Sequence, residues 1–138
     1  RGMYKVPVEI ANSNIEGKGV FATQNIAKDA LVWVFVAGHD ITMTVDEHEA
    51  LSTSEKELID KTGYLSPWSK LWIFPPQGDP AQYTNHSNKN NLTVVYDESV
   101  SSEPYFVANR DIVVGEELTN NYHEFDQITR SKRPAWSK

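Results

Sequence analysis

Residues 82–87 read Gln-Tyr-Thr-Asn-His-Ser, and Asn91 follows six residues after Asn85. Taken alone, this stretch leaves its meaning open. A lone histidine is most often a structural residue with satisfied hydrogen bonds, so His86 by itself indicates no site. The triplets that begin at Asn85 and Asn91 also match the acceptor pattern for N-linked glycosylation. No secretory signal segment is visible, so we expect these asparagines to be unmodified.

Two other stretches are equally ambiguous when each is considered alone. Gly17-Lys18-Gly19 is most simply a glycine turn, although glycine also lets a backbone approach a ligand closely. Residues 115–122 read Gly-Glu-Glu-Leu-Thr-Asn-Asn-Tyr, and a tyrosine after a short strand ordinarily fills core or surface. Order and spacing must therefore decide what the three stretches mean.

The remaining sequence predicts a mainly β fold with a small helical insert. Runs rich in β-branched and aromatic residues predict strands at 5–10, 31–36, 71–74, 92–96 and 105–108, with a turn near 115 before a short final strand. Capping boxes at 44–47 and 52–55 predict helices at about 45–51 and 53–62, the second ended by Gly63. Strands and helices do not alternate regularly, which argues against a Rossmann domain.

Composition limits the classes of function. The chain has 138 residues, a length typical of one domain, and its formal net charge is −6. That charge argues against binding to a phosphate backbone and suits a cationic partner. Cysteine is absent, which excludes disulfides, thiolate metal sites and a cysteine nucleophile. No apolar run approaches the roughly 18 residues of a membrane span, so we expect a soluble, intracellular protein.

Together, the three stretches resemble the SET domain, the fold of protein-lysine methyltransferases. Residues 17–22 look like its N-terminal motif, residues 82–91 like its Asn-His-Ser motif, and residues 110–122 like its C-terminal motif. The resemblance runs from about residue 5 to residue 126. It implies a single SET domain over 1–138, with a helical insert at about 44–63 and a C-terminal flank at 127–138. It also implies a β-clip fold with a knot-like C-terminal motif, and the brevity is similar to that of small bacterial or viral members. Such a member would be cytoplasmic, whereas a eukaryotic one could be nuclear.

The resemblance implies S-adenosylmethionine as cofactor and a lysine ε-amine as acceptor of the methyl group. Tyr122 would be the catalytic residue. The residues implied to hold the cofactor are Gly17, Lys18, Gly19, Tyr83, Asn85, His86 and Tyr122. The family's cysteine-rich flank is missing, so an aromatic residue of the tail, Phe125 or Trp136, is expected to close the site by stacking on adenine. For Trp136, packing on the core is an equally good interpretation.

Several positions depart from the family pattern. Gln82 stands where an arginine is common, Asn90 replaces a proline, and Asn120 and Asn121 replace an aromatic residue and an aspartate. These departures leave open an alternative, a SET-like module that binds a peptide or the cofactor without transfer. A metal site is not expected, because the four histidines lack a ligand pair such as His-x-x-x-His.

Methyl transfer from a sulfonium is a one-step displacement that requires alignment more than acid–base chemistry. The attacking lysine must be neutral, and a dry, narrow channel would favour its neutral form. Residues 46–60 carry six acids against Lys56, so this insert could attract a basic protein or peptide substrate, or it could simply be a solvated helical face.

Overall fold

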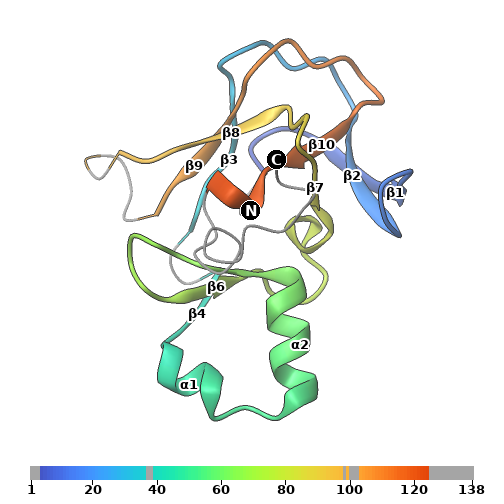
Figure 1. Cartoon of the computed structure of the whole chain (residues 1–138). Coiled ribbons are helices and arrows are strands. Elements are labelled where there is room, and N and C mark those ends of the chain that lie inside the picture. Colours follow the sequence, from blue (N-terminus) through green and yellow to red (C-terminus); the bar gives the residue numbers. More distant parts are fainter. Residues whose placement is uncertain (1–3, 37–38, 98, 100–102, 125–138) are drawn as a thin grey trace.

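The computed structural model describes residues 4–36, 39–97, 99 and 103–124 (Figure 1). Its strands form three small sheets, so the predicted mainly β fold is confirmed. The strands of the first sheet are β1 (Val8–Asn12), β2 (Lys18–Ala22), β10 (Glu117–Asn120) and β7 (Asn85–His86), in that order. This sheet holds one residue or more from each of the three motif stretches.

The other two sheets have three strands each. One has the order β3 (Leu31–Trp33), β9 (Tyr105–Ala108), β8 (Leu92–Val95). The other has the order β4 (Ile41–Met43), β6 (Trp72–Phe74), β5 (Tyr64–Leu65). Most predicted strands occur near their expected places, but the first begins at Val8 rather than residue 5, after Pro7, and β3 ends at Trp33 rather than residue 36.

Both helices of the insert begin where their capping boxes predict. They are α1 (Val45–Glu49) and α2 (Thr53–Thr62), and each has reciprocal side-chain-to-backbone hydrogen bonds at its N-terminus. α1 ends two residues earlier than predicted. Ile59 of α2 packs with Leu65 and Trp72 in a small cluster of its own. The helices therefore lie at the end of the molecule next to β4 and β6 (Figure 1).

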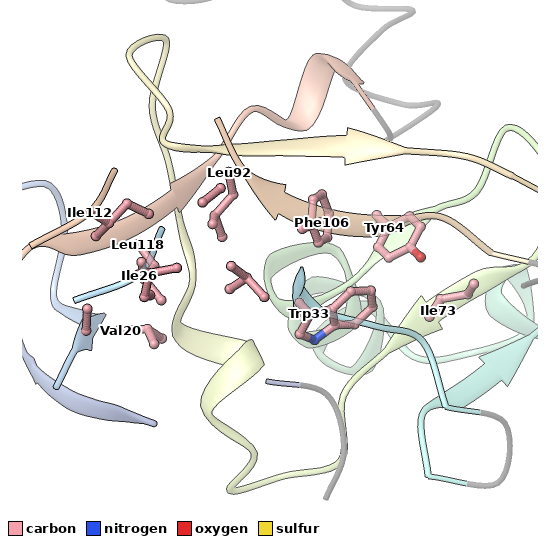
Figure 2. Close-up of a cluster of buried hydrophobic side chains, with 12 residues drawn as sticks. Val20, Ile26, Trp33, Tyr64, Ile73, Leu92, Phe106, Ile112 and Leu118 are labelled. Atoms are coloured by element: carbon pink, nitrogen blue, oxygen red, sulfur yellow. The ribbon is translucent and has the colours of Figure 1, made fainter. Parts of the chain in front are cut away.

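A core of twelve buried side chains joins the three sheets (Figure 2). It includes Val20 of β2, Phe106 of β9, Ile73 of β6 and Leu118 of β10. Burial of these side chains stabilises the fold and fixes how the sheets meet. Val20 and Leu118 therefore anchor β2 and β10 in the core.

Two short 3-10 helices were not predicted. η1 (Pro80–Tyr83) leads into β7, and η2 (Tyr122–Glu124) follows β10. β7 has only two residues and pairs in parallel with β10, with Asn85 opposite Thr119 and His86 opposite Asn120. Segments far apart in sequence thus lie side by side, which no local pattern could predict.

Candidate functional site

The side-chain amide of Asn85 connects all three motif stretches. Its Nδ2 lies 2.8 Å from Glu117 Oε2, 3.1 Å from the carbonyl oxygen of Lys18 and 3.2 Å from that of Glu16. It also lies 3.1 Å from Ser13 Oγ. Asn85 therefore holds the turn before β2 and the side chain of Glu117 together.

Glu117 and Gly19 fit each other closely. Ser13 Oγ donates to both carboxylate oxygens of Glu117, at 2.7 and 2.9 Å. A Cβ atom on Gly19 would lie 2.7 Å from Glu117 Cδ, closer than Cβ atoms come to other heavy atoms. A larger residue at position 19 would displace the carboxylate of Glu117 from its hydrogen bonds, and Gly19 is not among the residues that line the neighbouring cleft.

Gly17 has a different reason to be glycine. Its φ of 47° lies in the left-handed region, and its carbonyl accepts from Ser13 N at 2.8 Å to close the turn between β1 and β2. A Cβ atom there would meet nothing within 4 Å. The turn consequently presents bare backbone to open space, which suits close approach by a ligand.

A cleft of about 480 Å³ lies beside this turn. Its lining residues are 16–18, 58, 60–62 and 82–86. The volume falls within the roughly 300–1,000 Å³ typical of small-molecule sites. Five of the residues expected from the sequence, namely Gly17, Lys18, Tyr83, Asn85 and His86, line this one cleft.

One wall of the cleft was missed by sequence reasoning. Leu58, Asp60, Lys61 and Thr62 of α2 face the motif residues across it. The capping box at 52–55 predicts where α2 begins but carries no information on which neighbour its last turn meets. Asp60 is held there by His48, whose Nε2 lies 3.0 Å from Asp60 Oδ1.

Gln82, which stands where an arginine is common in the family, also lines the cleft. Its Oε1 accepts from Gly78 N at 2.6 Å, so it closes the turn that leads into η1. Tyr83, the last residue of η1, packs against the main core. The neutral side chain at position 82 thus has a local structural role.

His86, the last residue of β7, is half-buried. Its ring approaches that of His123 edge-on, with centroids 6.3 Å apart. Burial lowers the pKa of His86, and the neighbouring His123 lowers it further, although a hydrogen bond with Asn88 opposes both effects. The neutral form of His86 is therefore favoured beside the cleft.

Two hydrogen bonds hold the residues next to Tyr122. Asn121 Oδ1 accepts from His123 N at 3.0 Å, and the carboxylate of Glu124 accepts from Val94 N at 3.3 Å. η2 is thereby tied to β8. The side chain of Tyr122 and the whole of Phe125 and Trp136 lie outside what the structure describes.

Asn91 holds β10, the strand of the C-terminal motif, through two hydrogen bonds to its backbone. This residue is 2% exposed; its Nδ2 donates to the carbonyl of Glu117 at 2.8 Å and its Oδ1 accepts from Thr119 N at 2.9 Å. The side chain of Asn91 therefore makes the hydrogen bonds to part of β10 that a neighbouring strand would otherwise make. The spacing from Asn85 to Asn91, noted in the sequence, lets both asparagines reach Glu117.

Among residues 4–36, 39–97, 99 and 103–124, no group of three His, Cys, Asp or Glu side chains could hold a metal ion. His39 and His48 are instead paired with Asp79 and Asp60. Within the same ranges, no helix is long and apolar enough to cross a membrane.

Comparison with solved structures supports the fold. A Plasmodium falciparum protein assigned as a histone methyltransferase superposes with a TM-score of 0.56 at 17% identity, over 86% of this chain and 94% of that one. An apo structure of ctPRC2 that carries substitutions in Ezh2 gives a TM-score of 0.65 at 26% identity. That match covers 94% of this chain but only 16% of the other.

Sequence comparison gives the family. No curated protein sequence matches the chain. The family model described as SET domain matches residues 17–123, which spans all three motif stretches and most of the chain. The chain therefore belongs to the SET domain family.

Proposed function

We propose that this protein is an S-adenosylmethionine-dependent protein-lysine N-methyltransferase. The observation that carries the proposal is the position of Asn85, whose amide joins three separate family motifs at one edge of a cleft. The match to the SET domain family supports the general class of reaction.

The cleft suits the cofactor in size and in chemistry. Gly17 leaves space for close backbone approach by a ligand, and Asn85 Nδ2, which donates to the carbonyl oxygens of Glu16 and Lys18, holds this turn at the edge of the cleft. Lys18 and Lys61 supply positive charge at the cleft for a carboxylate. Half-buried His86 and Tyr83 offer rings and backbone groups for an adenine.

When bound, S-adenosylmethionine would supply an electrophilic methyl group on a sulfonium. The protein's part is to hold donor and acceptor in line and to exclude water. The rigid attachment of η2 to β8 would let Tyr122 orient the lysine amine. A lysine has a reference pKa of about 10.4, so the acceptor must lose a proton before it attacks.

A basic protein segment is the proposed substrate. The insert at 46–60 carries six acids and one lysine. Local contacts engage Glu47 and Glu55 in capping and Glu49 with Lys56, yet the segment keeps an excess of negative charge. That field would attract a lysine-rich peptide to the end of the molecule that forms one wall of the cleft.

Calorimetry with S-adenosylmethionine, followed by transfer of a labelled methyl group to a lysine-rich protein mixture, tests the proposal. We expect binding in the cleft and label on lysine side chains. Binding without transfer to any protein in the mixture would favour the alternative, a SET-like binding module. Absence of binding would contradict the proposed enzyme and would leave only the peptide-binding form of the alternative.

A further inference from the structure

A second, smaller cavity lies behind the cleft. It has a volume of about 50 Å³ and is lined by residues of all three sheets, mostly apolar ones. Thr62 and Thr84 border both the cavity and the cleft. The cavity adjoins the proposed cofactor cleft at these two threonines, but its other lining residues differ from those of the cleft.

Two residues that line this cavity each have a buried polar atom with no hydrogen-bond partner among the described residues. The two atoms are Nε1 of Trp33, at the end of β3, and Oδ1 of Asn120, at the end of β10. Both residues are 7% exposed. An indole N–H can only donate and an amide oxygen can only accept, so the two atoms are chemically complementary.

Buried polar groups in proteins nearly always have a partner, because an unpaired group has lost its hydrogen bonds to water. Trp33 cannot relieve this by turning away, since its ring is packed against Phe106 with centroids 5.3 Å apart (Figure 2). The backbone of Asn120 is held by the parallel pairing of β10 with β7. A molecule in the cavity would supply the missing partners.

The volume and the other polar groups of the cavity fit water. About 10–15 Å³ of such space is enough for one water molecule, which needs two to four polar partners. Three more polar residues also line the cavity: Tyr4 and Thr84, whose hydroxyls lie 2.5 Å apart, and Asp40. We propose that ordered water in this cavity accepts a hydrogen bond from Trp33 Nε1 and donates one to Asn120 Oδ1, thereby linking β3 to the motif strand β10.

Water-to-protein magnetisation transfer in NMR tests the proposal on the wild-type protein. The indole N–H of Trp33 should show a cross-peak with water whose sign indicates a long-lived water molecule. Trp72, which is 6% exposed and does not line the cavity, provides an internal comparison. A Trp33 indole with no such cross-peak would overturn the proposal.

The variant Asn120→Leu sharpens the test, because leucine keeps the size of the side chain and removes the acceptor. The Trp33 cross-peak should disappear in this variant while the Trp72 signal stays unchanged. An equally strong Trp33 cross-peak would contradict the proposed bridge. Should the variant fail to fold, a crystal structure of the wild type decides: water within hydrogen-bond distance of both atoms supports the proposal, and a dry cavity rejects it.

Discussion

Tyr122 begins η2, and contacts of Asn121 and Glu124 hold its backbone in place. We expect Tyr122→Phe to leave the affinity for S-adenosylmethionine nearly unchanged, because the ring and the backbone remain. The transfer rate should fall roughly 10- to 1,000-fold, as for a group that acts mainly in the transition state. Rates and affinities of the two proteins, measured side by side from about pH 7 to 9, check this.

The wild-type rate should also rise with pH over this range, since the acceptor lysine must be neutral. Tyr96→Phe is the matched control, because Tyr96 is exposed, stacks on Trp68 and borders neither cavity nor cleft. Equal losses of affinity and rate in Tyr122→Phe would make Tyr122 a structural residue instead.

Asp40 is a buried carboxyl with an unusual titration. Burial raises the pKa of Asp40 to about 6, although its hydrogen bond from Val36 N, at 2.8 Å, and the nearby His39 act in the opposite direction. A raised pKa in the folded state means that stability is greatest below the unfolded value of 3.8 and is lost as the pH rises through about 6. At neutral pH the ionised carboxylate therefore destabilises the fold.

Asp40→Asn should remove this destabilisation, because the buried side chain then carries no charge. The amide oxygen can still accept the hydrogen bond from Val36 N. We expect the free energy of unfolding at pH 7 to increase by about 1–3 kcal/mol. The gain should shrink between about pH 6 and pH 4 and be absent below that. Denaturant unfolding of both proteins at each pH measures it, and a difference that does not vary with pH would contradict the assignment.

At the scale of elements, β10 depends on Asn91 for two of its backbone hydrogen bonds. Asn91→Ala would leave the carbonyl of Glu117 and the amide of Thr119 without these partners. We expect a loss of about 2–4 kcal/mol in the free energy of unfolding. Asn14→Ala, in an exposed turn, should stay within about 0.5 kcal/mol of wild type in the same denaturant titration. Similar behaviour of the two variants would show that β10 does not need Asn91.

Lys61, in the last turn of α2, leads to a prediction about the affinity for S-adenosylmethionine. This prediction rests on the proposed function. Lys61 lines the cleft and forms no ion pair with any residue the structure describes, whereas Lys56 on the same helix is paired with Glu49. If Lys61 faces the carboxylate of S-adenosylmethionine, Lys61→Met should weaken binding roughly fivefold at low salt, and less at high salt.

Two controls separate this effect from others. Lys56→Met should bind like wild type. 5′-Methylthioadenosine lacks the amino-acid carboxylate, so Lys61→Met should bind it as well as wild type does. Calorimetry measures each variant with each ligand, and equal weakening for both ligands would remove Lys61 from carboxylate recognition without affecting the proposed function.

Sequence patterns predict some of these elements well. The capping boxes place the starts of α1 and α2, and the cofactor residues implied by the resemblance include Lys18, Asn85 and His86, which line one cleft in the structure. The contribution of α2 to the cleft, the two-residue strand β7 and the Trp33–Asn120 cavity could not be predicted. Each depends on contacts between distant segments, and neither periodicity nor a local signal encodes such contacts.

At the scale of the whole molecule, the cleft joins segments 16–18, 58–62 and 82–86, which only the complete fold brings together. A ligand that binds in this cleft binds only the folded chain, so it stabilises the folded state over the unfolded state. At a concentration about 100 times its dissociation constant, S-adenosylmethionine should therefore raise the free energy of unfolding by about 2.7 kcal/mol. Thermal unfolding with and without the ligand measures the gain.

Hydrogen exchange then locates the stabilisation. Amide exchange should slow most in these three segments together, and less in the β8–β9 hairpin, which lies outside the cleft. Adenosine alone, at the same concentration, should protect the segments less, because it lacks the charged end that the turn at 16–18 and Lys61 would hold. Protection confined to a single segment would mean that the ligand binds elsewhere, since a molecule in this cleft must contact all of its walls.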